Sequence, residues 1–328
     1  MSARPSIACL GAGRMARGIA VVFAYAGHGV RILDVKAREG TAYAETAAAV
    51  IAEVRRTLAS LADFGLFAAA AVDDIAGLVS VAQEGQAAAT LAEAAVVFEA
   101  VPEVLELKRQ VLARVSALAP RTIIASTTST ILVDQLADAV AHPERFLNAH
   151  WLNPAFLVPL VELAPGTRTD PEVTQYLRQL LHDIGKVPVV CAARPGYIVP
   201  RIQALAMNEA ARLLEEGVAS AEDIDKAIKY GFGVRFATLG MLEFIDWGGG
   251  DILYYASRSL SEALGSERYA APAIVERNMR EDRVGLRTGQ GFMNYEALDI
   301  EAYRRQRLRA FVELLGHLGL MRPPVLPG

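Results

Sequence analysis

Two residues near the middle of the chain have the types that proton transfer needs. His150 ends a segment that predicts a buried strand, and the next residues, 151–154, read Trp-Leu-Asn-Pro and must turn. A second predicted strand follows and carries Glu162, 12 residues after the histidine. Two strands joined by that turn can bring these side chains together, so that the carboxylate holds one ring nitrogen and leaves the other free to take a proton. The alternative for this pair is a purely structural hydrogen bond.

The other histidines do not share this setting. They lie in predicted turns, loops or helices where a surface position is expected, and they are His28, His142, His182 and His317. His150 is therefore the candidate general base.

A glycine-rich turn near the N-terminus has the spacing of a phosphate-binding loop. Residues 10–16 read Leu-Gly-Ala-Gly-Arg-Met-Ala, directly after a predicted strand and directly before a predicted helix. Gly11 and Gly13 allow a tight turn and a close approach of the backbone to a pyrophosphate, whose charge then lies against the free N–H groups of a helix that begins near Arg14 and Met15. The alternative is a tight turn without a ligand.

Asp34 adds a second element to that pattern. It ends the next predicted strand, 21 residues after Gly13. Its carboxylate can bind the ribose hydroxyls of NAD and repel the extra phosphate of NADP. The basic residues Lys36 and Arg38 keep NADP as an alternative cofactor, but the pattern favours NAD.

The elements that must position these residues are predicted from apolar runs that alternate with longer amphipathic stretches, as in a parallel sheet covered by helices. Strands are predicted at residues 6–10, 30–33, 78–81, 96–99, 123–126, 145–150, 158–163 and 187–191, and helices at 15–26, 43–62, 103–118, 131–140 and 171–184. After Pro195-Gly196 only helices are predicted, at 198–216, 221–230, 239–262, 273–280 and 300–318. We therefore expect a Rossmann-type, mostly parallel α/β domain over residues 1–194 and a smaller all-helical domain over residues 195–328.

Composition excludes several classes of protein. The 328 residues are 53% hydrophobic and 21% charged, with a formal net charge of -4, which argues against a disordered chain and against a nucleic-acid partner. The longest apolar runs fall short of the roughly 18 residues that a membrane span needs, so no membrane partner is expected. The N-terminus lacks a secretory pattern, and Cys9 and Cys191 are expected to be reduced thiols, which predicts a cytoplasmic location. No metal site is predicted.

Several spaced motifs follow one another along the chain. They are Gly11-x-Gly13, residues 99–103 with Lys108, residues 126–129, residues 150–154, Val161-Glu162, residues 195–199 and residues 289–292. They occur in the order seen in L-3-hydroxyacyl-CoA dehydrogenases, and the chain resembles that family from about residue 6 to residue 295. The resemblance extends to 3-hydroxybutyryl-CoA dehydrogenases and to the branch that includes lambda-crystallin and L-gulonate dehydrogenase.

The resemblance implies a role for each matching residue. His150 would be the general base, Glu162 would orient it, and Ser129 would hydrogen-bond the reacting oxygen. Glu103 and Lys108 would lie near the nicotinamide half of the cofactor, and Asn153 would help to form the site. These residue types suit the oxidation of a secondary alcohol, because the alcohol gives up a hydride to the cofactor only as its hydroxyl proton leaves.

One position departs from the family. Pro200 stands where relatives usually have an asparagine that joins the same hydrogen-bond network. A proline side chain can neither donate nor accept, so that contact is missing or comes from another residue. Ser126, Thr127 and Asn208 are candidates, and the sequence does not choose among them.

A second departure concerns the substrate. Acyl-CoA enzymes of this kind often carry lysines after the second strand, whereas residues 41–71 are dominated by alanine and leucine, with Arg55 and Arg56 as adjacent basic residues. Arg235, after a glycine-rich turn, resembles the branch that uses free hydroxy acids. An arginine can hold a carboxylate through two parallel hydrogen bonds. The alternative is an interface ion pair of Arg235, for instance with Glu243 or Asp246.

The leading expectation is NAD-dependent oxidation of an L-3-hydroxyacyl-CoA, such as 3-hydroxybutyryl-CoA in fatty acid metabolism, to the 3-ketoacyl-CoA. An NAD-dependent dehydrogenase of a free 3-hydroxy acid, such as L-gulonate, is the alternative, and a protein that binds NAD without turnover is the third. Apolar faces at 239–245 and 252–255 in a helical half with little core of its own predict a homodimer through that domain.

Overall fold

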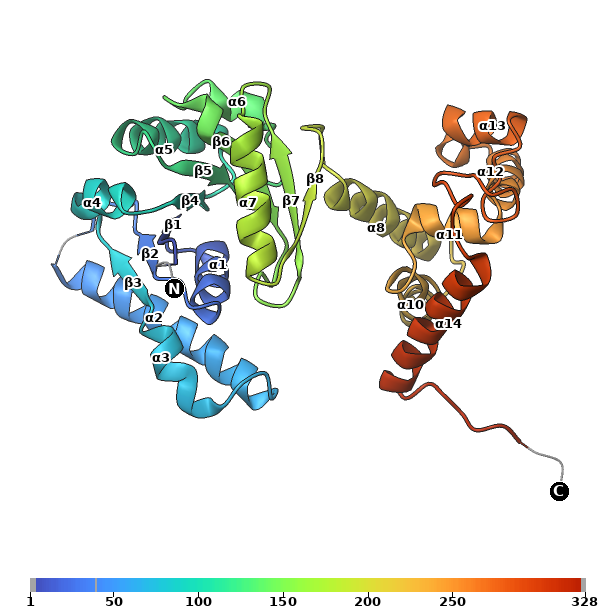
Figure 1. Cartoon of the computed structure of the whole chain (residues 1–328), viewed down its shortest axis with the longest axis horizontal. Helices are drawn as coiled ribbons and strands as arrows, with labels where there is room; N and C mark the ends of the chain where they lie inside the picture. The colour runs from blue at the N-terminus through green and yellow to red at the C-terminus, as the bar shows by residue number, and fades with distance from the viewer. Residues whose placement is uncertain (1–3, 39, 326–328) are drawn as a thin grey trace. The chain divides into compact units, whose positions relative to one another are not determined.

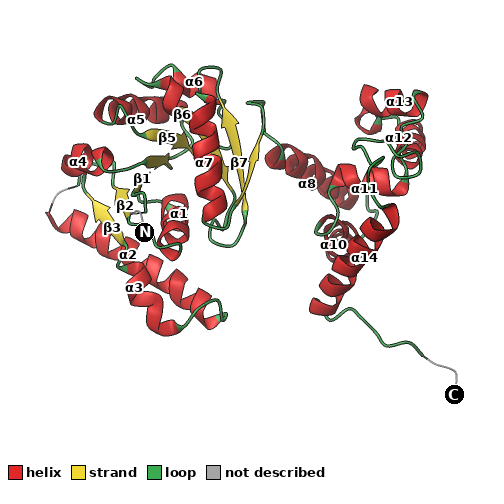
Figure 2. Cartoon of the chain, viewed as in Figure 1, coloured by secondary structure: helices red, strands yellow, loops and turns green. Residues whose placement is uncertain are grey.

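The computed structural model describes residues 4–38 and 40–325. The described chain divides into two compact units, Met1–Ala206 and Met207–Gly328, and passes from one to the other within helix α8 (Val199–Glu215). Among the described residues the named strands all lie in the first unit, and the second is built from helices (Figure 1, Figure 2). The predicted fold class, a mostly parallel α/β unit followed by a helical one, is confirmed.

Eight strands of the described chain form one sheet in the order β3-β2-β1-β4-β5-β6-β7-β8. Neighbouring strands are parallel except β6 and β7, which are antiparallel. The strands are β1 (Ile7–Leu10), β2 (Val30–Leu33), β3 (Val79–Ala82), β4 (Val96–Glu99), β5 (Ile123–Ser126), β6 (Phe146–Trp151), β7 (Leu160–Pro165) and β8 (Val187–Val190). Each predicted strand is present within two residues of its predicted bounds, because short apolar runs between turn residues are a strong signal for buried strands.

Helices cover both faces of this sheet, as Figure 1 shows. They are α1 (Arg14–Tyr25), α2 (Gly40–Asp63), α3 (Val72–Ala76), α4 (Ala87–Ala92), α5 (Leu105–Leu118), α6 (Val133–Ala137) and α7 (Pro171–Asp183). Helices α3 and α4 were not predicted, because five or six residues are too few to show a helical period.

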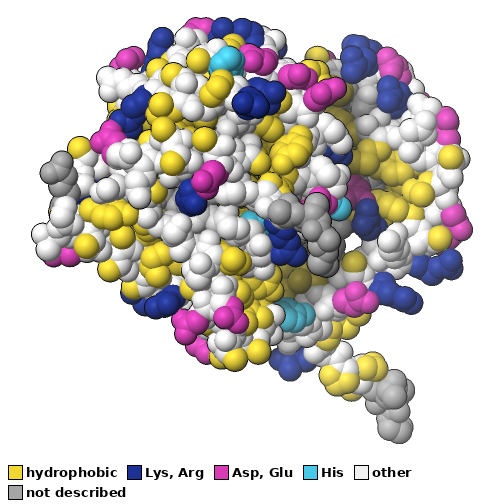
Figure 3. Space-filling model, turned by 60° about the vertical axis from the view of Figure 1, so that its left-hand side comes forward, with side chains coloured by type: hydrophobic (Ala, Val, Ile, Leu, Met, Phe, Trp, Pro, Cys, Tyr) yellow, Lys and Arg dark blue, Asp and Glu magenta, His cyan; other side chains and the backbone are white. Residues whose placement is uncertain are grey.

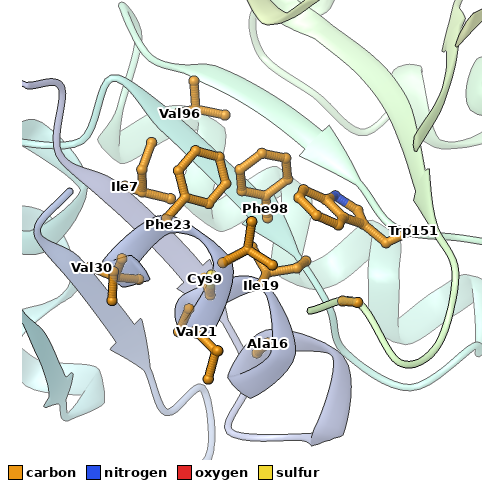
Figure 4. Close-up of a cluster of buried hydrophobic side chains, with 14 of the residues drawn as sticks. Ile7, Cys9, Ala16, Ile19, Val21, Phe23, Val30, Val96, Phe98 and Trp151 are labelled. Atoms are coloured by element: carbon orange, nitrogen blue, oxygen red, sulfur yellow. The ribbon is translucent and has the colours of Figure 1, made fainter. Parts of the chain in front are cut away.

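Alternate residues of each strand enter two separate cores. Ile7 and Cys9 of β1 pack in a core with α1, α2 and α7, whereas Ala8 and Leu10 pack in a second core with α4, α5 and α6. Figure 4 shows aromatic side chains of the first core. The Phe98 ring meets the Trp151 ring edge-on, with centroids 5.6 Å apart, which holds the end of β6 against β4. The residue before Trp151 is the candidate base.

The second unit contains α9 (Ala221–Ala227), one π-helical turn η4 (Ile228–Gly233), α10 (Val234–Phe236), α11 (Met241–Gly248), α12 (Gly250–Leu264), α13 (Ala273–Arg280) and α14 (Ile300–His317), together with most of α8. The single helix predicted over residues 239–262 is wrong. Gly249 has a φ of 108° and separates α11 from α12, and this backbone region is accessible to glycine at little cost. The helix predicted at 221–230 likewise ends early and continues as the π turn.

A buried carboxylate organises the glycine-rich segment near residue 290. Asp246 of α11 is 2% exposed and accepts hydrogen bonds from the backbone N–H groups of Phe292 and Met293, both at 2.9 Å, and from the Tyr295 hydroxyl at 3.1 Å. A Cβ atom at Gly291 would lie 2.1 Å from Asp246 Oδ1, so only glycine fits. This motif therefore serves the folding of the helical unit.

No helix in the described ranges has both the length and the apolar character that crossing a membrane requires.

Candidate active site

The antiparallel pairing of β6 and β7 places His150 directly opposite Glu162. His150 Nδ1 lies 2.8 Å from Glu162 Oε2, and both residues are buried. Glu162 Oε1 accepts the backbone N–H groups of Ile198 at 3.0 Å and Val199 at 2.8 Å. Both oxygens of this carboxylate are therefore bound inside the protein, and its orientation is determined by three hydrogen bonds.

The charge of Glu162 follows from the same contacts. Burial alone would raise the pKa of this carboxyl group, but hydrogen bonds from His150 and from the Val199 and Ile198 N–H groups outweigh burial and lower the pKa below its ordinary value. An ionised carboxylate can only accept hydrogen bonds. His150 Nδ1 must then carry the hydrogen, which leaves Nε2 without one when the ring is neutral.

Ser129 completes a chain of three side chains. Its Oγ lies 3.1 Å from His150 Nε2. It belongs to the loop of residues 127–132, which follows β5. The structure thus brings together the serine, histidine and glutamate that the resemblance singled out. The lone pair of the unprotonated Nε2 faces a hydroxyl group. In this geometry an imidazole can exchange a proton with an alcohol.

Pro200 fits the start of helix α8. The first N–H groups of a helix have no partner within it, and here Glu162 takes those of Ile198 and Val199, while Arg201 N–H bonds Gly196 O at 3.0 Å. Proline has no N–H group, so at this position it leaves no donor unsatisfied. Its side chain still provides no hydrogen bond. Of the suggested substitutes, Ser126 donates to Glu99 at 2.6 Å in the sheet.

Tyr197 is a contact of the histidine that was not predicted. Its ring centroid lies 5.8 Å from that of His150 with the planes tilted by 30°, and its hydroxyl donates to Ile131 O at 3.2 Å. Burial raises the pKa of Tyr197, so the hydroxyl stays protonated and remains a donor. Its φ of 41° is rare for a residue with a side chain. The Pro-Gly pair directly before it was the one available signal that the backbone turns sharply here.

A cradle for a dinucleotide lies at the carboxyl ends of β1, β2 and β4. A cavity of about 420 Å³ is lined by Gly11, Gly13, Asp34, Ala100 and Pro102, among others. Gly11 has a φ of 92°, and a Cβ atom there would lie 3.3 Å from Ala100 O. Among the described residues no side chain caps α1, whose N-cap is Gly13, so the first N–H groups of this helix remain available to an anion. The residues present fit the pyrophosphate of NAD.

Asp34, which follows β2, lines the same cavity. It is 2% exposed, accepts the Lys36 N–H at 3.2 Å and forms an ion pair with Arg38. Lys36 and Arg38, the two basic residues that kept NADP as an alternative cofactor, therefore both contact Asp34, Lys36 through its backbone N–H and Arg38 through its side chain.

The remaining predicted cofactor residues fall in different surroundings. Arg14 and Asn153 line a second cavity of about 380 Å³ between α1, α2 and the turn after His150, whereas Met15 packs against the first core. Lys108 is 1% exposed, and its Nζ lies 2.8 and 3.0 Å from the two oxygens of Glu99 and 3.2 Å from Val101 O. Because that ammonium group has three acceptors within the protein, we assign Lys108 to a buried ion pair.

Two other expectations change. His28 is not at the surface: it is 6% exposed, and its Nδ1 lies 2.9 Å from Pro5 O. Arg235 donates from Nε to Gly231 O at 2.8 Å and lies over the Phe244 ring at 5.4 Å.

The alternative for Arg235, an ion pair with Glu243 or Asp246, does not occur among the described residues. Glu243 instead pairs with Arg307 at 2.7 Å, and Asp246 is occupied by backbone N–H groups. Within residues 4–38 and 40–325, Arg235 has no carboxylate at ion-pair distance, and no group of three metal-binding side chains occurs.

The chain matches both parts of one family. Residues 6–194 match the NAD binding domain of 3-hydroxyacyl-CoA dehydrogenase, and residues 196–295 match the C-terminal domain of the same enzyme. The two matches meet at Pro195, between the last strand and α8.

Individual relatives agree with this match. The chain is 30% identical over 309 residues to 5-formyl-3-hydroxy-2-methylpyridine 4-carboxylate 5-dehydrogenase of Mesorhizobium japonicum, covering 94% of this chain and 96% of that one. It is 32% identical over 295 residues to 3-hydroxyadipyl-CoA dehydrogenase of Escherichia coli, covering 89% of this chain but 59% of the longer relative. The structure of a 3-hydroxyacyl-CoA dehydrogenase from Archaeoglobus fulgidus superposes with a TM-score of 0.76 at 29% identity, over 97% of this chain and 100% of that one.

With both family domains matched in order over most of its length, the chain belongs to the 3-hydroxyacyl-CoA dehydrogenase family and is an NAD-dependent oxidoreductase.

Proposed function

We propose that this protein oxidises the hydroxyl group at carbon 3 of an L-3-hydroxyacyl compound to a keto group. The observation that carries the proposal is the chain of contacts from Ser129 Oγ to His150 Nε2, at 3.1 Å, and from His150 Nδ1 to Glu162 Oε2, at 2.8 Å. It supplies a base with one nitrogen fixed and the other presented to a hydroxyl group.

In the oxidation, His150 Nε2 takes the proton of the substrate hydroxyl while the carbon–hydrogen bond at carbon 3 breaks and releases a hydride. Bound NAD supplies the acceptor for the hydride. Ser129 donates a hydrogen bond to the same oxygen, and the Glu162 carboxylate stabilises the imidazolium that forms. In the reduction, the imidazolium returns its proton to the carbonyl oxygen, which Ser129 polarises.

The substrate class is our narrower proposal. A CoA thioester such as 3-hydroxybutyryl-CoA is the first choice, supported by the match to both family domains and by a relative named 3-hydroxyadipyl-CoA dehydrogenase. A free acid is the second, supported by the guanidinium of Arg235, which has no carboxylate partner among the described residues, and by a relative named for a pyridine carboxylate.

We also propose that a second copy of the chain covers the helical unit, as the predicted homodimer requires. Large apolar side chains are exposed there, including Ile252 and Tyr255 at 63% each, and Figure 3 shows apolar side chains at the surface. A mass from light scattering of twice the 35.2 kDa chain mass would support this.

The free Cys9 and Cys191 are consistent with the proposed cytoplasmic location.

A substrate panel tests the function. NADH oxidation is measured with acetoacetyl-CoA beside free 3-keto acids, and we expect turnover with the thioester. Turnover with the acids alone would replace the first substrate class by the second, in which case Arg235→Met should raise KM for the acid by about tenfold or more. Turnover with neither class would contradict both enzymatic proposals and leave a protein that binds NAD without turnover.

His150→Gln removes the proposed base while keeping a polar side chain of similar reach. We expect kcat to fall by about 10²–10⁴-fold, because general-base catalysis contributes that much, while NADH affinity changes by less than about twofold. Steady-state kinetics and fluorescence titration of NADH measure the two effects. His142→Gln, at an exposed loop position, is the matched control. Preserved kcat in His150→Gln would show that the base is misassigned.

Asp34→Ala tests the cofactor preference. The carboxylate lines the cavity, where it can bind ribose hydroxyls and repel a 2′-phosphate. Its loss also frees Arg38 from its ion pair, and a free guanidinium favours that phosphate. We therefore expect the Kd of NAD to rise while the Kd of NADP rises less or falls. An equal loss of affinity for both would mean that the carboxylate does not face the ribose.

A further inference from the structure

The loop that carries Ser129 lies between β5 and α6 and has no regular secondary structure. Ser129 Oγ must nevertheless stay at hydrogen-bond distance from His150 Nε2 for the proposed chemistry. The side chains of residues outside the loop show what holds it.

Glu103 is the main acceptor for the loop. Its Oε1 accepts the N–H groups of Ser129 at 3.0 Å and Thr130 at 3.1 Å and the Thr130 hydroxyl at 3.0 Å, and the Thr128 hydroxyl donates to the same oxygen. Three consecutive residues centred on the serine therefore share one carboxylate oxygen.

Glu103 is ionised under ordinary conditions. Burial alone would raise the pKa of this carboxyl group, but the Thr128 and Thr130 hydrogen bonds and the Lys108 ammonium group outweigh burial and lower the pKa. A charged acceptor binds N–H and O–H donors more strongly than a neutral one.

The other oxygen of Glu103 is tied to the sheet. Its Oε2 lies 3.4 Å from Lys108 Nζ, and Lys108 is anchored by the fully buried Glu99 at the end of β4. Glu99 also accepts the Ser126 hydroxyl at 2.6 Å and the Val101 N–H at 2.8 Å. A continuous path of ion pairs and hydrogen bonds thus runs from β4 through Lys108 and Glu103 to the Ser129 backbone.

Two further contacts hold the flanks of the loop but do not reach the serine. Asn148 Nδ2 donates to Thr128 O at 3.2 Å, and the Tyr197 hydroxyl donates to Ile131 O. Neither can replace the acceptor of the Ser129 N–H group. Glu103 alone among these groups acts on the serine itself.

We propose that Glu103 is a positioning residue that sets Ser129 Oγ against His150 by binding the backbone of residues 129 and 130. The catalytic consequence of this positioning rests on the proposed function, whereas the ordering of the Ser129 loop by Glu103 does not. The resemblance implies another role, in which Glu103 contacts the cofactor directly, and the two roles predict different results.

Glu103→Ala tests the proposal first without any turnover. Amide hydrogen exchange is followed at Ser129 and Thr130 in the full chain, with Glu106→Ala as the matched control at an exposed position on α5. We expect exchange at both amides to accelerate by about tenfold or more in Glu103→Ala and to stay unchanged in the control. Unchanged exchange in Glu103→Ala would overturn the proposal, whatever the enzyme turns over.

A double-mutant cycle separates positioning from cofactor contact. We expect Glu103→Ala to lower kcat by about 10–100-fold, since small misplacements of reacting groups cost that much, with NADH Kd changed by less than about twofold. In a Ser129→Ala background the same substitution should lower kcat by less than about twofold further, because its target is gone. Glu103→Gln should retain part of the activity, since its amide oxygen still accepts hydrogen bonds. Additive losses of kcat together with weaker NADH binding would assign Glu103 to the cofactor instead.

Discussion

The bidentate use of the Glu162 carboxylate is the interaction on which the rest of the site depends. One oxygen holds His150 Nδ1, and the other takes two N–H groups where the chain turns into α8. The same carboxylate therefore sets the orientation of the candidate base and satisfies the start of the helix that leads into the second unit. Removing this carboxylate would leave the buried His150 and the N–H groups of Ile198 and Val199 without their acceptor at once.

Much of this arrangement could be predicted from the sequence because it rests on local signals. The eight strands follow from apolar runs between turn residues, and the single antiparallel pair follows from the short turn between His150 and Glu162. The glycine turn and Asp34 lie in one cavity because a parallel sheet brings the carboxyl ends of β1 and β2 together. In each case the contacts between residues are determined by neighbours in the sequence or by the repeating topology of the parallel sheet.

The features that were missed depend on contacts between distant segments. Gly249 interrupts a stretch whose apolar period continues on both sides, so only its backbone angle reveals the break. His28 is polar and adjoins a turn, yet its buried ring finds a hydrogen-bond partner in the Pro5 carbonyl. Tyr197 contacts the His150 ring from 47 positions away, and the sequence did not show that Glu103 binds the Ser129 loop.

We propose that Glu162 fixes the tautomer of His150 and leaves Nε2 free for the substrate proton. The ¹⁵N chemical shifts of the imidazole, assigned by their loss in His150→Gln, report which nitrogen carries the hydrogen. With the ring neutral, we predict a protonated Nδ1 and a bare Nε2, and in Glu162→Gln a shift of population toward the other tautomer. A wild-type ring protonated at Nε2 and bare at Nδ1 would contradict this role of Glu162.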